Sequence, residues 1–592
     1  MDQKKKQNNG FLYENIKHVE YHFDEIPLNE YPRPNLKRES FVCLNGYWDL
    51  AICQNNKEIN YDKKVLVPFA VESPLSEVNH LLEPDEILVY KRVFNYKKPA
   101  KPKHLFLNCD GIDQICEVYI NNNFVGKHVG GYTKFKFDIS EFAIDGENEI
   151  IIKVQDLTDS SYHSRGKQCL NPNHQYIYSS SSGIYKPIWL EEVNENFIES
   201  VKFTPLVDEN SVRILIKTNV DGIAHLKIGN QIIDVKTNEV AIINLDEVHL
   251  WSPSHPYLYI VNIKFDEDEV ESYFGFRKIE IKKDRNNKPQ IYLNNKKIIL
   301  NGVLDQGYYY LGNLTPKSYL DYKADILALK ELGFNTIRKH IKIECDMFYY
   351  LCDSLGMLVV QDFVNGGEKY SFAQTVFPRL FSPILNRPWF ESNKRSGRNL
   401  QESKDEFKRE MVETMDTLWN YPSIVVYTIF NESWGQFDTK DNYLFCKFYD
   451  GSRLFDASSG WIDTRYNDFY SVHAYTTPKR IRHDKKKFNR PYYLSETGGR
   501  GYEVKGHFDY GKLWGQGYSK DQADMDLKYK DMYEALIKQV NKGDLVGIIY
   551  TQLSDIECEA NGLFTFDREV LKITKKLVQD VNQKININIE ED

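Results

Sequence analysis

Two glutamates, Glu432 and Glu496, each end a run of apolar residues abruptly. Glu432 lies in the stretch TIFNESWGQF (428–437), which directly follows the apolar run 424–427. Glu496 is the last residue of the stretch YYLSE. Opposed carboxylates are what cleavage of a glycosidic bond needs, because one protonates the leaving oxygen and the other attacks or stabilises the anomeric carbon. The two roles require different pKa values, and the apolar border predicts a raised pKa for Glu432.

Other apolar segments of the same region also end in polar or ionisable residues. The candidate site residues among them are Asp305, Arg338, His340, Asp362, Asn431, His473, Tyr475, Tyr550 and Gln552. Burying so many polar groups separately would be costly. We therefore expect them to line one shared pocket.

The segments that carry these residues alternate with amphipathic helices, of which 317–333 and 404–420 are the clearest. Eight strands are predicted, at 297–304, 334–338, 356–362, 423–432, 460–465, 469–475, 492–496 and 546–553. Eight such units predict a (β/α)8 TIM barrel, whose active site lies at the C-terminal ends of the strands. An open doubly wound sheet is the alternative, but no GxGxxG motif follows the first strand.

The chain before the barrel is typical of two β-sandwich domains. Residues 1–195 contain many short strands between Gly, Asn and Asp turns, which predicts a jelly-roll-like β-sandwich. Residues 196–285 continue in strands and have the size of an immunoglobulin-like β-sandwich. With the barrel at 286–592, the chain is predicted to have three domains, since 592 residues are too many for one core.

Composition excludes several classes of partner. The net charge of −9 and the lack of a basic stripe argue against nucleic acid. The sequence has no run of about 18 apolar residues, so no membrane span is predicted. No apolar segment of the kind found in signal peptides follows the basic opening, so a cytoplasmic protein is expected. The nine cysteines are scattered without CxxC spacing, which favours reduced thiols over a zinc site.

Motifs along nearly the whole chain resemble those of glycoside hydrolase family 2, which contains β-galactosidases, β-glucuronidases and β-mannosidases. The first sandwich carries DGIDQICEVYINNNFVG and SSGIYKPIWLEEV, and the second carries LWSPSHPYLY and YFGFRKIEI. The barrel carries LNGV, LKELGFNTIRKH, FNESWG and LSETGG in the same order as the family. Many independent motifs in one order make chance agreement very rare.

The resemblance implies a retaining double displacement, with Glu432 as general acid/base and Glu496 as nucleophile. Retaining enzymes hold these carboxyls about 5–5.5 Å apart. The resemblance further implies that Asn431 bonds the sugar 2-hydroxyl, that Tyr475 lies near the nucleophile, and that Arg338 lies beneath it. Asp110 matches a position whose loop reaches toward the sugar. No organic cofactor is implied.

Several departures from the family bear on metal and sugar. The Glu and His that large β-galactosidases use for magnesium are missing from VVQDFVNGGEK, so no metal site is predicted. Asp305 alters one wall of the sugar pocket, and Tyr550 stands where a Trp is common. Together with His340 and Asp362, these departures are expected to decide which sugar is bound. No Asn-x-Lys element of the kind that glucuronidases use is present, which weighs against glucuronic acid.

Each candidate also has a structural alternative. Glu432 fits a solvated loop acid or an accidental glycosylation sequon, and Glu496 fits a structural acid. His473 fits a core histidine, while Asp305 and Asp362 fit ion pairs within the barrel. Asp110 fits a turn cap.

The sequence therefore predicts an exo-acting retaining β-glycosidase that takes an oligosaccharide or glycoside, with β-galactosidase favoured over β-glucuronidase and β-mannosidase. A homo-oligomer is compatible with the family. The alternative from another class is a catalytically inactive carbohydrate-binding protein on the same fold. The intact Glu pair with Asn431 discriminates against it.

Overall fold

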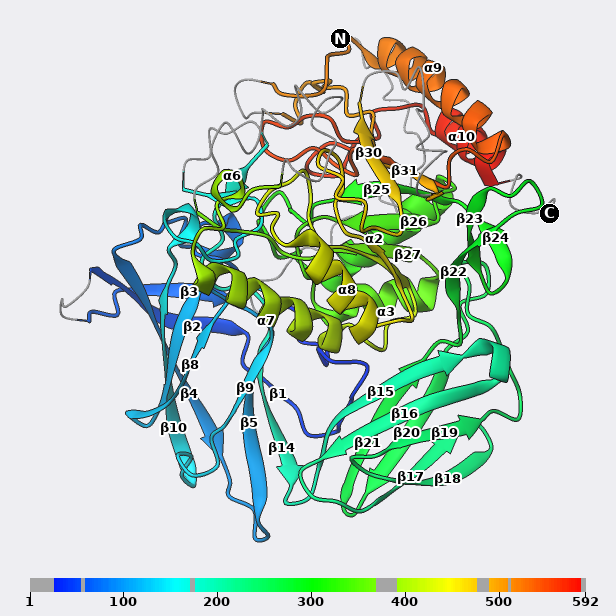
Figure 1. The fold of residues 1–592 in the computed structure, drawn as a ribbon. Helices are drawn as coiled ribbons and strands as arrows, with labels where there is room; N and C mark the ends of the chain where they lie inside the picture. The colour runs from blue at the N-terminus through cyan, green and yellow to red at the C-terminus, as the bar shows by residue number, and fades with distance from the viewer. Residues whose placement is uncertain are drawn as a thin grey trace, which may run out of the picture.

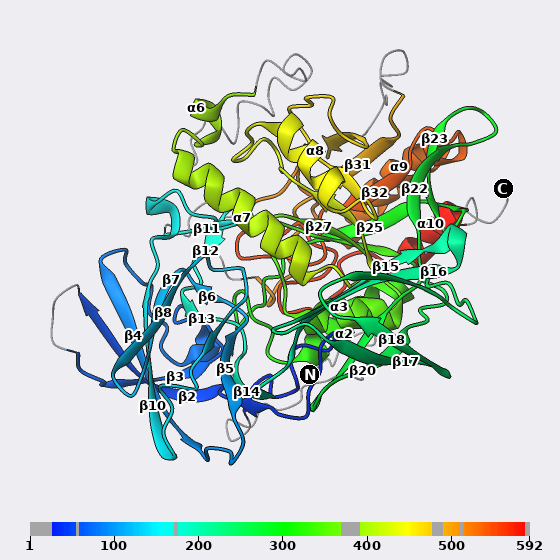
Figure 2. The same cartoon turned by 60° about the horizontal axis from the view of Figure 1, so that its bottom comes forward.

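The chain folds into two β-sandwiches that lie side by side against a parallel barrel (Figures 1 and 2). The predicted fold class is confirmed. The structure is a computed structural model, which describes residues 26–54, 59–170, 176–368, 391–475, 489–508 and 513–586.

The first sandwich packs two antiparallel sheets face to face. One sheet has the order β3 (Lys63–Val67), β2 (Gly46–Gln54), β4 (Glu86–Tyr96), β10 (Gly146–Gln155), β7 (Ile115–Ile120) and β8 (Asn123–Val129). The other has the order β1 (Val42–Cys43), β14 (Ile188–Asn194), β5 (Lys103–Cys109) and β9 (Phe135–Asp138). Alternate residues of β10 are buried, as expected for a strand with one face on a core.

Short strand pairs extend from this sandwich toward the barrel. They are β6 (Ile112–Asp113) with β13 (Gly183–Ile184), and β11 (Gln168–Cys169) with β12 (Tyr178–Ser179).

The second sandwich also has two antiparallel sheets. The smaller sheet has the order β15 (Ile198–Leu206), β16 (Ser211–Thr218) and β19 (Val240–Asn244). The larger has the order β18 (Gln231–Lys236), β17 (Ile223–Ile228), β20 (Tyr259–Phe265) and β21 (Asp268–Phe274). A three-stranded sheet of β22 (Ile279–Lys283), β23 (Pro289–Leu293) and β24 (Lys296–Ile298) leads into the barrel, and its apolar residues pack with those of the barrel strands.

The barrel consists of eight parallel strands in chain order. They are β25 (Leu300–Asp305), β26 (Thr336–Lys339), β27 (Leu358–Asp362), β28 (Ile424–Thr428), β29 (Leu454–Asp456), β30 (Tyr470–Ala474), β31 (Tyr492–Thr497) and β32 (Gly547–Tyr550). Seven predicted strands overlap these, but the prediction of a fifth strand at 460–465 is wrong. That segment is a loop, and the fifth strand is the three-residue β29.

Helices cover the outside of the barrel. They are α2 (Tyr319–Glu331), α3 (Asp346–Leu355), α6 (Asn393–Ser396), α7 (Gln401–Thr417), α8 (Thr439–Tyr449), α9 (Gln522–Asn541) and α10 (Lys575–Asn586). Helix α2 begins with a capping box between Ser318 and Asp321 and is followed by Gly333 at φ +86°, a conformation that glycine adopts readily. None of the described helices is both long enough and apolar enough to span a bilayer.

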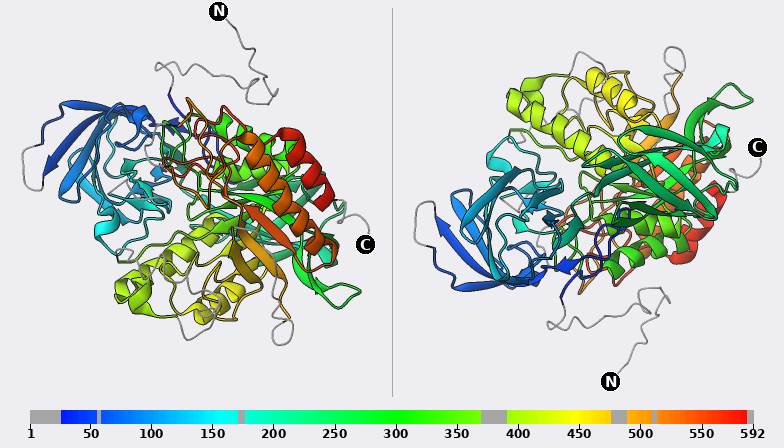
Figure 3. Two further views of the ribbon diagram at one scale, coloured as in Figure 1. Left: turned by 90° about the horizontal axis from the view of Figure 1, so that it is seen from above. Right: turned by 90° about the horizontal axis from the view of Figure 1, so that it is seen from below.

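Both sandwiches dock on the barrel through polar contacts. Arg277 of the second sandwich donates to the carbonyls of Pro422, Ile424 and Ser452. The first sandwich meets α7, where His163 Nδ1 lies 2.6 Å from Glu406 Oε2. Helices α9 and α10 lie on the side of the barrel away from the first sandwich (Figure 3).

Candidate active site

The backbone places Glu432 and Glu496 at the C-terminal rim of the barrel. Beyond β28 the chain stays paired with the chain after β29, since the Glu432 N–H donates to the Ser459 carbonyl at 2.8 Å. Glu432 then takes a left-handed conformation at φ +51°, which turns the chain out of the strand direction. Glu496 lies within β31, where the pairing register with β30 shifts by one residue, as at a β-bulge that re-aims a side chain.

The two carboxylates face each other across one hydroxyl. The Tyr475 hydroxyl lies 2.7 Å from Glu496 Oε2 and 3.0 Å from Glu432 Oε1, and it donates its one proton to either of them. One oxygen of each carboxylate and one ring nitrogen of His473 lie within 4.8 Å of one another. This spacing agrees with the short carboxyl separation of retaining glycosidases.

Arg338, a residue of β26, joins several polar groups at the bottom of the site. Its guanidinium makes a two-point ion pair with Asp362, with Nε and Nη2 at 3.1 and 2.9 Å from the carboxylate oxygens. It also donates to Glu496 Oε1 at 3.3 Å and to Asn431 Oδ1 at 2.8 Å. Because the Asn431 oxygen is taken, its amide N–H groups are the part that can face a sugar hydroxyl. Arg338 lies beneath the pair, as the resemblance implied.

His340 also lies at the bottom of the site, next to Asp362. Its Nδ1 lies 2.9 Å from Asp362 Oδ2, and burial, followed by the charge of Lys167, lowers the pKa of His340 to about 4. Burial alone would raise the pKa of Asp362, but Arg338 and His340 lower it to about 2. Asp362 is therefore an anion that orients two neighbours.

The predicted raised pKa of Glu432 is wrong. Burial alone does raise it, but the hydrogen bond and charge of His473, the charge of Lys167 and the hydrogen bond of Tyr475 together lower the pKa below its ordinary value. His473 Nδ1 lies 2.9 Å from Glu432 Oε1, and its Nε2 lies 2.7 Å from Ser459 Oγ. The apolar strand before Glu432 gives no sign of these partners, which come from other strands.

Four predicted site residues make no hydrogen bond to Glu432 or Glu496 in the described part of the chain. Asp305 bonds Lys339 at 2.5 Å, which is the ion pair of the structural alternative. Gln552 accepts from Gln306 at 2.6 Å, and the Tyr550 ring packs against Gly498 rather than the pair. The buried Asp110 lies 3.4 Å from Lys134 in the first sandwich and contacts neither glutamate.

The first sandwich supplies residues that the sequence did not reveal. The ammonium of Lys167 lies 5.4 Å from the ring centre of Trp434 and 5.6 Å from that of Tyr178, and its charge acts on Glu432. The Tyr178 hydroxyl donates to buried Glu559, a third carboxylate whose interaction partners include Lys167 and Glu496. Spacing offered no signal for these contacts, because they join different domains.

Two clusters of the described residues have donor sets that suit a cation. One is the trio of Glu432, His473 and Glu496, and the other is the more exposed group of His507, Asp567 and Glu569. In the first cluster every group also has a role in the hydrogen bonds given above. The aromatic residues from Tyr370 to Phe390 are a further set that the sequence offers for the leaving-group side, and they lie outside the described residues.

A sugar-binding-type sandwich, an immunoglobulin-like sandwich and a TIM barrel with facing glutamates define the multidomain architecture of a glycoside hydrolase. Residues 35–193 match the model for the sugar binding domain of Glycosyl hydrolases family 2, and residues 284–587 match the model for its TIM barrel domain. Residues 197–277 match a further model, described as Glycosyl hydrolases family 2. The chain belongs to glycosyl hydrolases family 2.

Similar proteins of the family are named as two kinds of glycosidase. A beta-galactosidase of Thermoanaerobacter pseudethanolicus is 31% identical over 297 residues, which is 46% of this chain and 39% of that protein. A putative beta-glucuronidase of Formosa agariphila is 24% identical over 490 residues, which is 74% of this chain and 54% of that protein. The chain thus matches about half or less of either relative's length.

Solved structures share the fold. A beta-D-glucuronidase of Dictyoglomus thermophilum superposes with a TM-score of 0.73 at 18% identity, covering 94% of this chain and 98% of that one. A beta-galacturonidase of Eisenbergiella tayi bound to galacturonate gives a TM-score of 0.69 at 18% identity, covering 93% and 99%. At this identity the likeness extends to the fold alone.

Proposed function

We propose that the protein is an exo-acting retaining β-glycosidase and that β-galactosides are its substrates. The observation that carries the reaction type is the pair Glu432 and Glu496, bridged by the Tyr475 hydroxyl at 3.0 and 2.7 Å. A catalytically inactive binding protein would have no need for this arrangement of buried acids.

The reaction proceeds in two displacements. Glu496 attacks the anomeric carbon while the bond to the leaving oxygen breaks, and Glu432 gives that oxygen its proton. The glycosyl ester on Glu496 is then attacked by water, whose proton Glu432 accepts, and the ester bond breaks to restore the carboxylate. His473 Nδ1 and the Tyr475 hydroxyl face the same Glu432 oxygen, at 2.9 and 3.0 Å, so both are placed to act on the proton that Glu432 gives and takes.

Glu559 supports a neutral sugar. It is buried, accepts hydrogen bonds from Tyr178 and from Asn561 Nδ2 at 2.9 Å, and interacts electrostatically with Glu496. A sugar carboxylate would bring a further negative charge to a pocket that already holds three carboxylates, and like charges at such range repel. A neutral galactoside avoids this repulsion.

A β-uronide is the second candidate, and Lys167 is the observation that favours it. The ammonium has ring contacts to Tyr178 and Trp434 but no hydrogen bond or ion pair within the part of the chain that the structure describes. Such a cation is suited to a sugar carboxylate.

The test is turnover of aryl β-glycosides of galactose, galacturonic acid, glucuronic acid, mannose, glucose and arabinose. We expect the galactoside to have the highest kcat/KM, and a uronide in first place would replace the galactoside proposal with the second candidate. Lys167→Met should then lower uronide turnover far more than galactoside turnover. Turnover of none of the glycosides would refute the enzyme reading.

Variants of the two glutamates test the mechanism. Glu496→Ala should lose activity on every substrate, because no nucleophile remains. Glu432→Ala should keep activity on aryl glycosides with acidic leaving groups, which depart without a proton. Full activity of both variants would exclude the assigned roles.

A further inference from the structure

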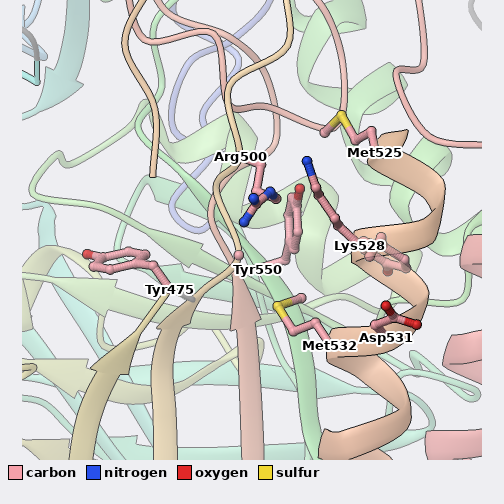
Figure 4. Close-up of a pocket in the computed structure, with 9 residues that line it drawn as sticks. Tyr475, Arg500, Met525, Lys528, Asp531, Met532 and Tyr550 are labelled. Atoms are coloured by element: carbon pink, nitrogen blue, oxygen red, sulfur yellow. The ribbon is translucent and has the colours of Figure 1, made fainter. Parts of the chain in front are cut away.

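A cavity of about 170 Å³ lies beside the catalytic pair, between the rim of the barrel and helix α9 (Figure 4). Tyr475 and Gly498, which is two positions after Glu496, line one end of it. The Tyr475 hydroxyl, which bonds both glutamates, points away from the other labelled lining side chains (Figure 4). Its other lining residues are Arg500, Met525, Lys528, Tyr529, Asp531, Met532 and Tyr550. The mechanism above uses only Tyr475 of this set.

Arg500 presents a guanidinium without a counter-ion to this cavity. Its Nε is buried and has no acceptor, and Arg500 makes no hydrogen bond or ion pair with any of the described residues. The guanidinium lies close over Gly517, where an added Cβ would be 3.4–3.5 Å from Nη1, Cζ and Nη2. The buried Nε is costly to leave without an acceptor, and the Nη groups stay available to a ligand.

The rest of the lining sets the charge and shape of the cavity. The Lys528 ammonium is offset by Asp524 at 2.5 Å and also donates to the Tyr518 carbonyl at 2.9 Å. Asp531 lines the cavity from an exposed position. In Figure 4 the Arg500 guanidinium, the Tyr550 hydroxyl and the Lys528 ammonium lie toward the same part of the cavity. Arg500 is therefore the cation in this lining that lacks an opposing acid.

We propose that this cavity binds an anionic group of the glycoside, a carboxylate or a sulfate, through Arg500. Guanidinium groups bind such planar or multi-oxygen anions through paired hydrogen bonds. Because Tyr475 both lines the cavity and bonds the two glutamates, we assign the anion to the molecule being cleaved. This inference rests on the proposed glycosidase function. The anionic group lies on either the sugar or the aglycone, and substrates distinguish the two sources.

The experiment compares three fluorogenic substrates in wild type, Arg500→Gln and Arg500→Lys. They are 4-methylumbelliferyl β-galactoside, its 3-carboxyumbelliferyl counterpart with the acid on the aglycone, and a 4-methylumbelliferyl β-uronide with the acid on the sugar. A charge-assisted hydrogen bond is worth about 1.5–3 kcal/mol. We therefore expect Arg500→Gln to lower kcat/KM about 10- to 100-fold on one anionic substrate and less than twofold on the neutral one. Arg500→Lys should restore part of the loss.

Controls separate this effect from misfolding and from failure of the proposed function. Arg213→Gln removes an exposed arginine of the second sandwich and should change none of the three values. If no glycoside is turned over, calorimetry with free umbelliferone-3-carboxylate tests the cavity alone, and wild type should bind it at least tenfold more tightly than Arg500→Gln. Equal losses on all substrates, no loss on either anionic one, or equal calorimetric binding would overturn the proposal.

Discussion

If Glu432 is the proton donor as proposed, replacing His473 should move the pH dependence of activity upward. His473 is the largest influence that lowers the pKa of the Glu432 carboxyl against the effect of burial. Hydrogen bonds to charged groups contribute about 1.5–3 kcal/mol, and one pKa unit corresponds to about 1.4 kcal/mol. We expect His473→Asn, which keeps a neutral donor, to raise the pKa of Glu432 by about one unit, and His473→Ala by about two.

The assay is kcat/KM against pH for a phenyl β-glycoside of the preferred sugar, whose poor leaving group needs the proton. The alkaline limb of this profile reports loss of that proton. It should therefore move to higher pH in the order wild type, His473→Asn, His473→Ala. The matched control is Tyr443→Phe on helix α8. It removes a hydroxyl that donates to Asp468 at 2.8 Å, and it should leave the alkaline limb in place. A limb that stays or falls in both His473 variants would refute the reasoning.

Of two further predictions, the first concerns stability and the second concerns activity. Burial opposes ionisation of Glu344, but Lys339 and Lys342 lower the pKa of Glu344 from 4.5 to about 2. The ionised Glu344 therefore contributes about 3 kcal/mol to the free energy of unfolding above pH 4.5, and this contribution is lost as the pH falls to 2. Glu344→Gln should lower the free energy of unfolding in urea at pH 7 and flatten its decline in acid, and an unchanged decline would contradict the assignment. Gly498→Ala should abolish most activity. The added Cβ would lie 2.5 Å from the Tyr550 ring, and Gly498 has a backbone φ of +80°, which alanine rarely adopts. Gly146→Ala, at φ +99° with nothing within 4 Å, controls for backbone strain in the same activity and thermal-melting assays.

The sequence predicts the barrel well where strands are long and apolar. Its one wrong strand illustrates the limit, because β29 has only three residues, Leu454–Asp456, too few to show a pattern. The loop that was taken for the strand contains Trp461, which is buried because its ring packs edge-on against His473 at 5.3 Å. Burial of a loop by tertiary contacts leaves the same apolar signature as a strand.

The site divides along a similar line. Glu432, Glu496, Asn431, Arg338 and Tyr475 come together as expected, because each follows or ends a strand and parallel strands present one common rim. The direction of the Glu432 pKa could not be predicted, since it depends on which side chains from other strands reach the same oxygen.

Residues of the first sandwich were harder still to predict. Lys167 and Tyr178 reach the pocket only through the docking of two domains, a relation that local pattern does not encode. Asp110 was chosen from the same domain, and it lies in a buried ion cluster with Lys134 instead.

The bond between Tyr178 and Glu559 joins positions 381 residues apart. Domains generally fold as units while the chain is being synthesised, the N-terminal one first. The first sandwich is therefore able to fold early, yet its side of the pocket has no opposite wall until the ribosome has passed strand β32 and the loop beyond it. A nascent or truncated chain that stops before this loop would carry both Glu432 and Glu496 and still lack one wall of the pocket.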